Sequence, residues 1–349
     1  MDFSRPDPAM FDVPFTTEEF RGMPYRLLGR SGLRVSSVGL GTWKMGLPES
    51  GDGARVDERT SYAILDRALE LGVTFWDTAN RYNAGSGNAE RIIGRWLRRH
   101  PDERRNVIIA TKVYGGMDGR TPNHSGLSRM NILDAVHACL ERLQCGHIDL
   151  LYFHRFDPTT PVQESLCAVL DLVRQDLVRY FAVSNFTADQ LALYAETEAR
   201  LGVRSRVLAV QNRYDIVRGE AEAHRGVLEY AAREGVSFVA YSPLALGLLT
   251  ERYLDPGRAG PGDRLVDEGA LEHAASPEVL GRVRRLAELA HGWGLRLSQL
   301  ALAYMLGLPG MGPAIPSAST VAQLEENAAA GRVVLSPEQR EAVRQVVGV

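Results

Sequence analysis

Eight short runs rich in β-branched and aromatic residues recur along this chain, and longer segments with helical spacing of apolar residues separate them. The runs are VSSVGLGT (35–42), VTFWDTA (73–79), NVIIATK (106–112), IDLLYFH (148–154), VRYFAVSN (178–185), RVLAVQN (206–212), VSFVAYS (236–242) and PAIPS (313–317). Apolar residues three and four positions apart form one face of a helix. This spacing occurs at Val162, Leu166, Val169, Leu170 and Val173, and again at Val279, Leu280, Val283, Leu286, Ala287 and Ala290. The alternation predicts repeated strand–helix units.

Such units constrain the fold strongly. Neighbouring parallel strands need a long connection, which a helix supplies through a right-handed crossover. Eight units close into a (β/α)8 TIM barrel, whose functional mouth lies at the carboxyl ends of the strands. A chain of 349 residues could also hold two average domains, but no linker or shift in composition divides this one. We predict a leader over residues 1–22, one barrel domain over residues 23–349, and a small hairpin around Gly29 and Gly32.

Charge and composition exclude several classes of function. The chain has 40 basic and 43 acidic side chains without a long single-sign block, which disfavours a nucleic-acid-binding protein. No segment reaches the roughly 18 to 20 apolar residues that span a bilayer. The acids and prolines near the N-terminus match neither a secretory signal nor a transit peptide, so we expect a cytoplasmic protein that binds no membrane. The sequence does not determine the oligomeric state.

The cysteines indicate neither a disulfide framework nor a metal site. Cys139, Cys145 and Cys167 are few and odd in number, which fits a reducing compartment. His137 and His147 flank two of them, but the segment from 132 to 153 is typical of an amphipathic helix that continues into a strand. The spacing matches no usual zinc pattern. We therefore expect no metal site.

Most of the predicted strands end in a polar residue: Asp77, Lys112, His154, Ser184 with Asn185, Gln211, Tyr241 and Ser317. A barrel brings all of these to one mouth, and burying them costs free energy unless they pair. We expect Asp77 to pair with Lys112, and the Lys112 ammonium to lower the pKa of the Tyr82 phenol. Tyr82 would then give a proton to a substrate oxygen near neutral pH. The alternative is a rim of ordinary ion pairs with Tyr82 as a surface aromatic residue, but four converging groups favour a built site.

Two further features concern ligands. The loops at about 113–128 and 242–277 are long and follow strands, so we expect them at the mouth in functional roles. The segment GLGTWKMG has Lys44 where a dinucleotide fingerprint has its third glycine, which disfavours a Rossmann domain. No metal, flavin or covalent-nucleophile motif is visible in the sequence.

From Tyr25 to its end, the chain resembles the aldo-keto reductase family. The segments that carry the resemblance are DTANRY, ATK, IDLLYFHRFDPTTP, VRYFAVSNF, VQNRY, AYSPLALGLLTERY and IPSASTVAQLEEN, in order and in register. The resemblance implies a catalytic tetrad of Asp77, Tyr82, Lys112 and His154. In that tetrad Tyr82 is the general acid in carbonyl reduction and His154 orients the carbonyl oxygen.

The resemblance also implies a nicotinamide cofactor, which would deliver hydride, because side chains alone do not reduce carbonyls. Ser184, Asn185 and Gln211 would bind its carboxamide, Tyr241 would stack on its ring, and Ser242, Leu244, Gly247 and Leu249 would follow the pyrophosphate. The adenosine end would lie among Ser317, Ser319, Gln323, Glu326 and Asn327. The further expected contacts are Gly41, Thr42, Trp43, Asp77, Pro243, Arg252, Arg264 and Ile315. The alternative for residues 317–327 is a plain strand-to-helix turn with polar caps.

Several positions depart from the family pattern. Asn83 and Ser317 stand where glycine is common, and Asp176 and Leu177 replace a usual Gly-Lys pair. Relatives often carry a basic residue at position 317 or 323 to hold the 2′-phosphate of NADPH. The branch that includes potassium-channel β subunits lacks one and still takes NADPH. We therefore predict NADPH, with NADH as the alternative, and expect Arg252 or Arg264 to supply the charge.

The expected substrate is a small carbonyl compound. Trp43, Tyr82, Tyr114 and His154 are the predicted pocket residues, while Trp76 could face either the pocket or the helices. The segment GMDGRTPNHSGLSR (116–129) resembles a loop of bacterial members that act on sugars or sugar-derived carbonyls. Two alternatives to a carbonyl reductase stay open: an NAD-linked sugar or alcohol dehydrogenase, and a redox-sensing regulatory subunit with little turnover.

Overall fold

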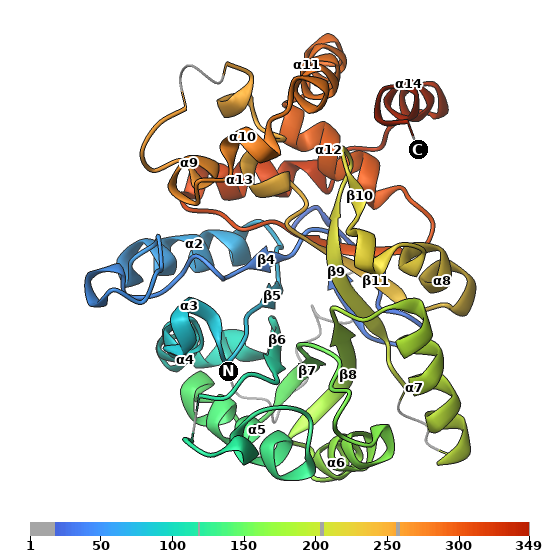
Figure 1. Ribbon diagram of the computed structural model, residues 1–349. Helices are drawn as coiled ribbons and strands as arrows, with labels where there is room; N and C mark the ends of the chain where they lie inside the picture. The colour runs from blue at the N-terminus through green and yellow to red at the C-terminus, as the bar shows by residue number, and fades with distance from the viewer. Residues whose placement is uncertain (1–17, 118, 203–205, 256–258, 349) are drawn as a thin grey trace, which may run out of the picture.

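The computed structural model describes residues 18–117, 119–202, 206–255 and 259–348, and eight parallel strands occupy its centre with helices around them (Figure 1). The strands are β4 (Leu40–Gly41), β5 (Phe75–Asp77), β6 (Ile108–Val113), β7 (Ile148–Phe153), β8 (Val178–Ser184), β9 (Ala209–Asp215), β11 (Ser237–Tyr241) and β12 (Met311–Ile315). They pair in chain order, each in parallel with the next. The predicted (β/α)8 barrel is confirmed. Most of the predicted leader, residues 1–17, lies outside the described residues.

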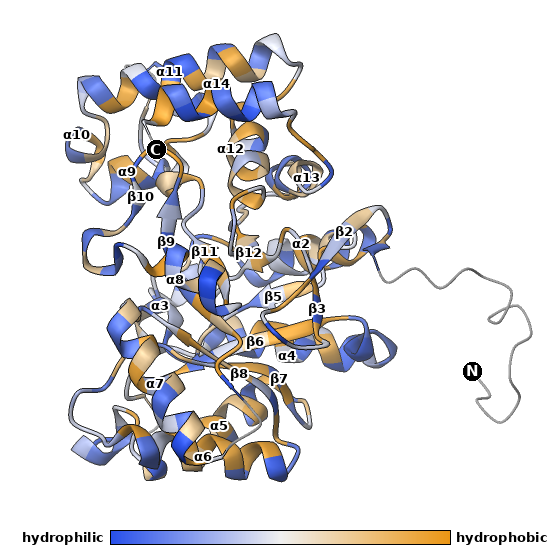
Figure 2. Cartoon of the chain, turned by 90° about the vertical axis from the view of Figure 1, so that its right-hand side faces the viewer, coloured by the Kyte–Doolittle hydropathy of each residue, from blue (hydrophilic) through white to orange (hydrophobic). Residues whose placement is uncertain are grey.

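Helices connect and cover the strands. The longer ones are α2 (Glu58–Glu70), α4 (Asn88–Arg99), α5 (Arg129–Leu143), α6 (Val162–Arg174), α7 (Ala188–Arg200), α8 (Val227–Glu234), α11 (Pro277–Gly292), α12 (Leu297–Leu306), α13 (Val321–Ala330) and α14 (Pro337–Val347). Short turns of helix are α3 (Tyr82–Gly85), α9 (Arg264–Asp267) and α10 (Leu271–Ala274). Helices such as α2, α4 and α6 have an apolar face toward the strands and a polar face on the other side, as their spacing predicts (Figure 2). None of the helices within the described ranges is long and apolar enough to cross a membrane.

The barrel nearly closes between its first and last strands. The Gly39 amide donates to the carbonyl of Ala314 at 2.8 Å, and Gly41 forms a parallel bridge with Ser317. A Cβ at Gly41 would lie 2.9 Å from the Ser317 hydroxyl, so glycine permits this approach. The predicted first strand, residues 35–42, is divided in the structure: its beginning forms β3 (Arg34–Ser36) and only its end forms β4.

An antiparallel hairpin closes the amino-terminal end of the barrel. It consists of β2 (Met23–Leu27) and β3, and β1 (Glu19–Phe20) pairs with β2 on its other side. Leu28 and Val35 of this hairpin join the buried cluster inside the barrel, which includes Phe75 and Leu150. The other end of the barrel is therefore the one that is open to ligands.

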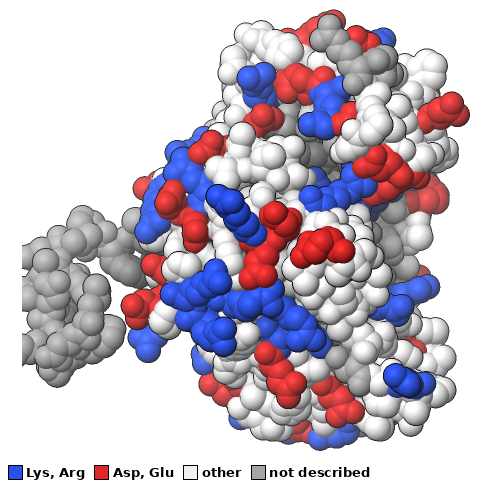
Figure 3. All heavy atoms as spheres, turned by 90° about the vertical axis from the view of Figure 1, so that its left-hand side faces the viewer, with Lys and Arg blue, Asp and Glu red and all other residues white. Residues whose placement is uncertain are grey.

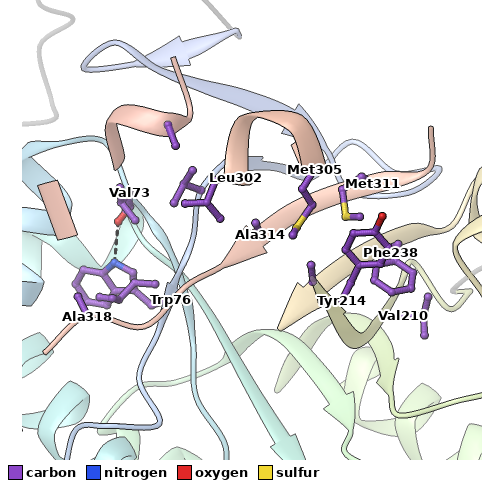
Figure 4. Close-up of a cluster of buried hydrophobic side chains, with 14 of the residues drawn as sticks. Val73, Trp76, Val210, Tyr214, Phe238, Leu302, Met305, Met311, Ala314 and Ala318 are labelled. Atoms are coloured by element: carbon purple, nitrogen blue, oxygen red, sulfur yellow. Dashed lines mark hydrogen bonds between the residues drawn. The ribbon is translucent and has the colours of Figure 1, made fainter. Parts of the chain in front are cut away.

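A second, larger hydrophobic cluster lies between the strands and the helices, and Figure 4 shows part of it. Trp76 belongs to this outer cluster, donates its indole N–H to the Val73 carbonyl at 2.8 Å, and stacks edge-on against Trp96. Alternate residues of a strand face opposite sides, so Trp76 points toward the helices while Phe75 and Asp77 point into the barrel. Trp76 is therefore no pocket residue.

We expect Gly29→Ala to lower the free energy of unfolding by about 2–4 kcal/mol. Gly29 adopts a left-handed conformation with φ of +56°, and a Cβ there would lie 2.3 Å from the Leu208 carbonyl oxygen. Gly32→Ala is the control, because a Cβ at Gly32 meets nothing within 4 Å. Urea unfolding of both variants measures the difference. Equal free energies of unfolding would contradict the prediction that the close approach of Gly29 to Leu208 requires glycine.

Candidate active site

Asp77, Tyr82 and Lys112 form one hydrogen-bonded group at the carboxyl ends of β5 and β6. The Lys112 ammonium donates to Asp77 Oδ1 at 2.5 Å, to the Thr78 carbonyl at 2.8 Å and to the Tyr82 hydroxyl at 2.8 Å. Tyr82 donates to Asp77 Oδ1 at 3.2 Å. Both side chains of the Asp77–Lys112 pair are only 1% exposed. The predicted pairing is present in the structure, and all three ammonium hydrogens have acceptors.

Neighbouring strands hold Asp77 from its other side. Gln211, the third residue of β9, donates to Asp77 Oδ2 at 2.7 Å. The Thr42 hydroxyl and amide, just after β4, both donate to the Asp77 carbonyl. Hydrogen bonds to a buried carboxylate stabilise its charged form. Asp77 is therefore fixed in place between the first, second, third and sixth strands of the barrel.

Burial controls the protonation of these groups. Burial, with the Asp77 carboxylate beside it, raises the pKa of Tyr82 well above its ordinary value. Burial also lowers the pKa of Lys112. The direction expected for Tyr82 is wrong in the free protein, because the ammonium is shared with Asp77 and does not offset the cost of a buried phenolate. Tyr82 therefore keeps its proton at neutral pH and has one to donate.

His154 stands opposite Tyr82 at the end of β7, with the two ring centroids 6.2 Å apart. Burial, followed by the Lys112 charge, lowers the pKa of His154 to about 3. The imidazole is therefore neutral at physiological pH and carries one ring N–H. A neutral imidazole can donate a hydrogen bond to a carbonyl oxygen without competing with Tyr82 as an acid.

The amide and hydroxyl groups predicted for the cofactor form a chain beside His154. Asn185 donates to the His154 carbonyl at 2.9 Å and accepts from the Tyr241 hydroxyl at 3.0 Å. Ser184 donates to the Gln211 carbonyl at 2.8 Å. Residues from β7, β8, β9 and β11 thus meet in one network. Their amide and hydroxyl groups fit the carboxamide of a nicotinamide, which needs both donors and acceptors.

Left-handed backbone conformations gather in the loops at the mouth. Asn83, Asn185 and Ser242 have φ of 54°, 58° and 54°, and Ala245 and Leu246 follow at 49° and 61°. Non-glycine residues rarely adopt this region, and they cluster at functional sites. The Asn83 side chain also donates to the Met45 carbonyl at 2.5 Å.

These angles explain two departures from the family pattern. Asn83 stands where glycine is common, and asparagine tolerates the left-handed conformation better than most residues. Asp176, which also replaces a glycine, has φ of 59°. In both places the backbone keeps the conformation that glycine favours.

A cavity of about 1050 Å³ opens beside the tetrad. The described residues that line it are Arg81, Tyr114, Gly115, Ser125, His154, Arg155, Phe156, Pro158, Asn185, Thr187, Gln190, Ala223 and His224. Tyr114 and His154 thus lie where the sequence predicts a substrate pocket. The other two predicted pocket residues, Tyr82 and Trp43, are absent from this lining. Trp43 lies under the Arg264 guanidinium, 4.4 Å from the ring centroid.

The residues predicted to contact the rest of the cofactor lie in the loop after β11, around the end of β12 and in α13. After β11, Pro243 is buried, Gly247 has φ of 103°, and Leu249 is wholly buried, so Leu249 supports this loop from beneath. After β12, the Ser319 amide donates to the Gln323 side chain at 2.8 Å. Ser317 lies against Gly41, and Glu326 accepts a hydrogen bond from Ser298. Asn327 is buried, and Ile315 belongs to the cluster inside the barrel.

Lys44 is a functional candidate that our sequence reasoning missed. Its ammonium donates to the Ser319 hydroxyl at 3.0 Å. Burial, and then the charges of Arg264, Arg55 and Arg252, lower the pKa of Lys44 to about 8. A signal for it exists in the composition: Lys44 and Lys112 are the only two lysines in the whole sequence. Arginine serves at every other cationic position, and both lysines lie at the mouth.

The three arginines around Lys44 each pair with a carboxylate, whereas Lys44 has no such partner among the described residues. Arg55 pairs with Asp267, Arg252 with Asp263, and Arg264 with Glu268. Lys44 forms no salt bridge within the described part of the chain and bonds only to a hydroxyl. It therefore fits an anion such as a cofactor phosphate better than the two arginines that the sequence suggested.

The cysteines in and just after α5 form hydrogen bonds of their own. Cys139 is buried and accepts from Arg142 at 3.5 Å, and Cys145 donates to the His147 carbonyl. Within the described ranges, no three side chains of the His, Cys, Asp and Glu types are grouped to hold a metal ion.

Comparisons with known proteins place this geometry in context. A family model described as the aldo/keto reductase family matches residues 37–347, which contain all the barrel strands. The aldo-keto reductase AMT2 of Alternaria alternata is 33% identical over 337 residues, covering 90% of this chain and 89% of that protein. The versiconal hemiacetal acetate reductase of Aspergillus parasiticus is 32% identical, covering 91% and 95%. A probable voltage-gated potassium channel subunit beta of Arabidopsis thaliana is 30% identical, covering 93% and 97%.

Proposed function

This chain belongs to the aldo/keto reductase family and is an NAD(P)H-dependent oxidoreductase of carbonyl compounds, and we propose that it reduces an aldehyde or ketone to an alcohol with NADPH. The observation that carries the proposal is the buried hydrogen-bonded group of Asp77, Lys112 and Tyr82. Sugar-derived carbonyls fall within the proposed range, as the loop at 116–129 predicts. The free Cys139, Cys145 and Cys167 support a reducing compartment, the cytoplasm.

In the proposed mechanism His154 and Tyr82 act on the same substrate oxygen. His154 donates a hydrogen bond from its neutral ring and orients the carbonyl, which also draws electron density from the carbonyl carbon. The chemistry that a nicotinamide would supply when bound is hydride donation to the carbonyl carbon. As negative charge develops on the oxygen, Tyr82 gives up its proton and becomes a phenolate. Lys112 stabilises this phenolate at 2.8 Å, and Asp77 keeps the ammonium charged and in place.

The choice of NADPH over NADH is supported by Lys44. A 2′-phosphate near Ser319 would receive a charge-assisted hydrogen bond from an ammonium that has no carboxylate partner among the described residues. The hydroxyls of Ser317 and Ser319 supply hydrogen-bond donors for the adenosine end. Arg264 and Arg252 add positive potential around the same position.

We expect Tyr82→Phe to lower kcat by about 10²–10⁴-fold, because the variant lacks the proton donor. The dissociation constant for NADPH should stay within about twofold, since the phenol acts in the chemical step and not in cofactor binding. Loss of nicotinamide absorbance with a panel of aldehydes and ketones measures turnover. Tyr62→Phe, which removes a phenol from the outer helix α2, is the control.

The outcomes of this assay separate the candidate functions. Turnover that survives in Tyr82→Phe would contradict the mechanism. Tight NADPH binding without turnover in the wild type would instead favour a regulatory subunit. Faster oxidation of alcohols with NAD⁺ than reduction with NADPH would favour a dehydrogenase.

We expect NADP⁺ to raise the pKa of Lys44, whereas NAD⁺, which lacks the 2′-phosphate, should leave it near 8. A phosphate favours the charged ammonium, so NADP⁺ affinity should fall as the pH rises above about 8 and the free protein loses this proton. Because the chain has only two lysines, ¹³C NMR after reductive methylation can follow Lys44 directly.

Lys44→Met is the matched variant for this test. It should weaken NADPH binding by about tenfold and change NADH binding much less, because a charge-assisted hydrogen bond is lost only with NADPH. Equal effects of the two cofactors on the Lys44 titration would contradict the assignment.

A further inference from the structure

The cavity beside the tetrad carries positive charge without negative charge to balance it. Arg81 and Arg155 both line it, and no Asp or Glu is found among the described residues of the lining. Lys112 does not add to this excess, because Asp77 neutralises it at 2.5 Å. A cavity with one sign of charge attracts ligands of the other sign.

Arg81 precedes the proposed acid, Tyr82, and lines the cavity from an exposed position. Its side chain lies flat against Gly115, where a Cβ would come within 2.3 Å of Arg81 Cδ. A larger residue at position 115 would displace the arginine. Within the described ranges, Arg81 forms no hydrogen bond or ion pair, so its guanidinium hydrogens are available.

Arg155 follows His154, and it also lacks an ion-pair partner within the described ranges. The nearest acid along the chain is Asp157, which accepts from the Leu127 amide at 2.7 Å and from both Thr159 and Thr160. These hydrogen bonds lower the pKa of Asp157 to about 2 despite its burial. Asp157 thus has its acceptors occupied, and Arg155 has no carboxylate partner in the described part of the chain.

Several arginines elsewhere on the surface form ion pairs, which these two do not within the described ranges. On the face seen in Figure 3, basic and acidic side chains lie beside one another. Among the arginines that do form ion pairs, Arg67 pairs with Glu70 and Glu325, and Arg95 with Glu58. Arg81 and Arg155 have no such partner in the described part of the chain, and both border the cavity.

We propose that the natural carbonyl substrate carries a carboxylate or phosphate group, which Arg81 and Arg155 bind. The inference rests on the proposed function, because it takes the carbonyl to lie between Tyr82 and His154. The planar guanidinium matches both kinds of anion with two parallel hydrogen bonds. Thr187 and Gln190 add polar contacts, and Phe156 and Pro158 cover the apolar part of the ligand.

Each arginine is the chain neighbour of a proposed catalytic residue, Arg81 of Tyr82 and Arg155 of His154. Short aldehydes with a terminal carboxylate or phosphate are therefore the first substrates to test.

Matched substrate pairs test the proposal with NADPH and the wild-type protein. The pairs are succinic semialdehyde and butanal, 4-carboxybenzaldehyde and benzaldehyde, and glyceraldehyde 3-phosphate and glyceraldehyde. We expect kcat/KM to be at least about tenfold higher for the anionic member of at least one pair. The first two pairs report on a carboxylate and the third on a phosphate.

Variants assign that preference to the two arginines. Arg81→Gln and Arg155→Gln should each remove most of it by raising KM for the anionic member, with kcat and the neutral substrates changed less than about threefold. Arg98→Gln, at an exposed position near the end of α4, is the control. An equal loss for neutral and anionic substrates would show a structural role and overturn the proposal, as would the lack of any preference in the wild type.

A binding measurement decides the question even without turnover. Calorimetry of the protein saturated with NADP⁺ should detect succinate or glycerol 3-phosphate with a dissociation constant below about 1 mM. The Arg81→Gln/Arg155→Gln double variant should bind at least tenfold more weakly. If no carbonyl is reduced, the proposed function fails while this binding still supports an anion site; if carbonyls are reduced but neither anion binds, only the anion proposal fails.

Discussion

The buried ion pair between Asp77 and Lys112 is the interaction on which the rest of the site depends. Its two side chains come from adjacent strands and are each 1% exposed. Breaking a buried pair by removing one partner is strongly destabilising, yet an intact pair often adds no net stability, because desolvation offsets the attraction. A barrel core of apolar side chains would fold without it. The pair is therefore best understood through the groups that it controls.

Those groups are Tyr82 and His154, whose protonation states follow from the pair and from burial. The Asp77 carboxylate makes a phenolate at Tyr82 unfavourable in the free protein. When Tyr82 gives its proton to the substrate oxygen in the proposed mechanism, the Lys112 ammonium stabilises the phenolate that results. The same ammonium helps to keep His154 neutral. In the proposed mechanism, one acid and one neutral hydrogen-bond donor consequently face the same substrate oxygen. A second buried ion pair joins Arg142 and Glu90. Glu90 also accepts a hydrogen bond from the hydroxyl of Thr111, the chain neighbour of Lys112.

Much of this arrangement could be predicted from the sequence, because its signals are local. Strand–helix alternation predicts the barrel, and polar residues at strand ends predict the mouth. The division of residues 35–42 between β3 and β4 could not be predicted, since it depends on how closely Gly39 and Gly41 approach β5 and β12. The pKa of Tyr82 was predicted in the wrong direction because burial is not visible in a motif. Lys44 was missed because its partner, Ser319, lies 275 positions away.

The free energy of unfolding of Asp77→Asn, Lys112→Met and the double variant tests the central claim most directly. If the pair serves chemistry more than stability, each single variant should lose about 3–5 kcal/mol and the double variant should recover at least about 2 kcal/mol of the summed loss. The refolded double variant should nevertheless lack turnover. Strictly additive losses, or a double variant that still reduces carbonyls at the wild-type rate, would contradict the account.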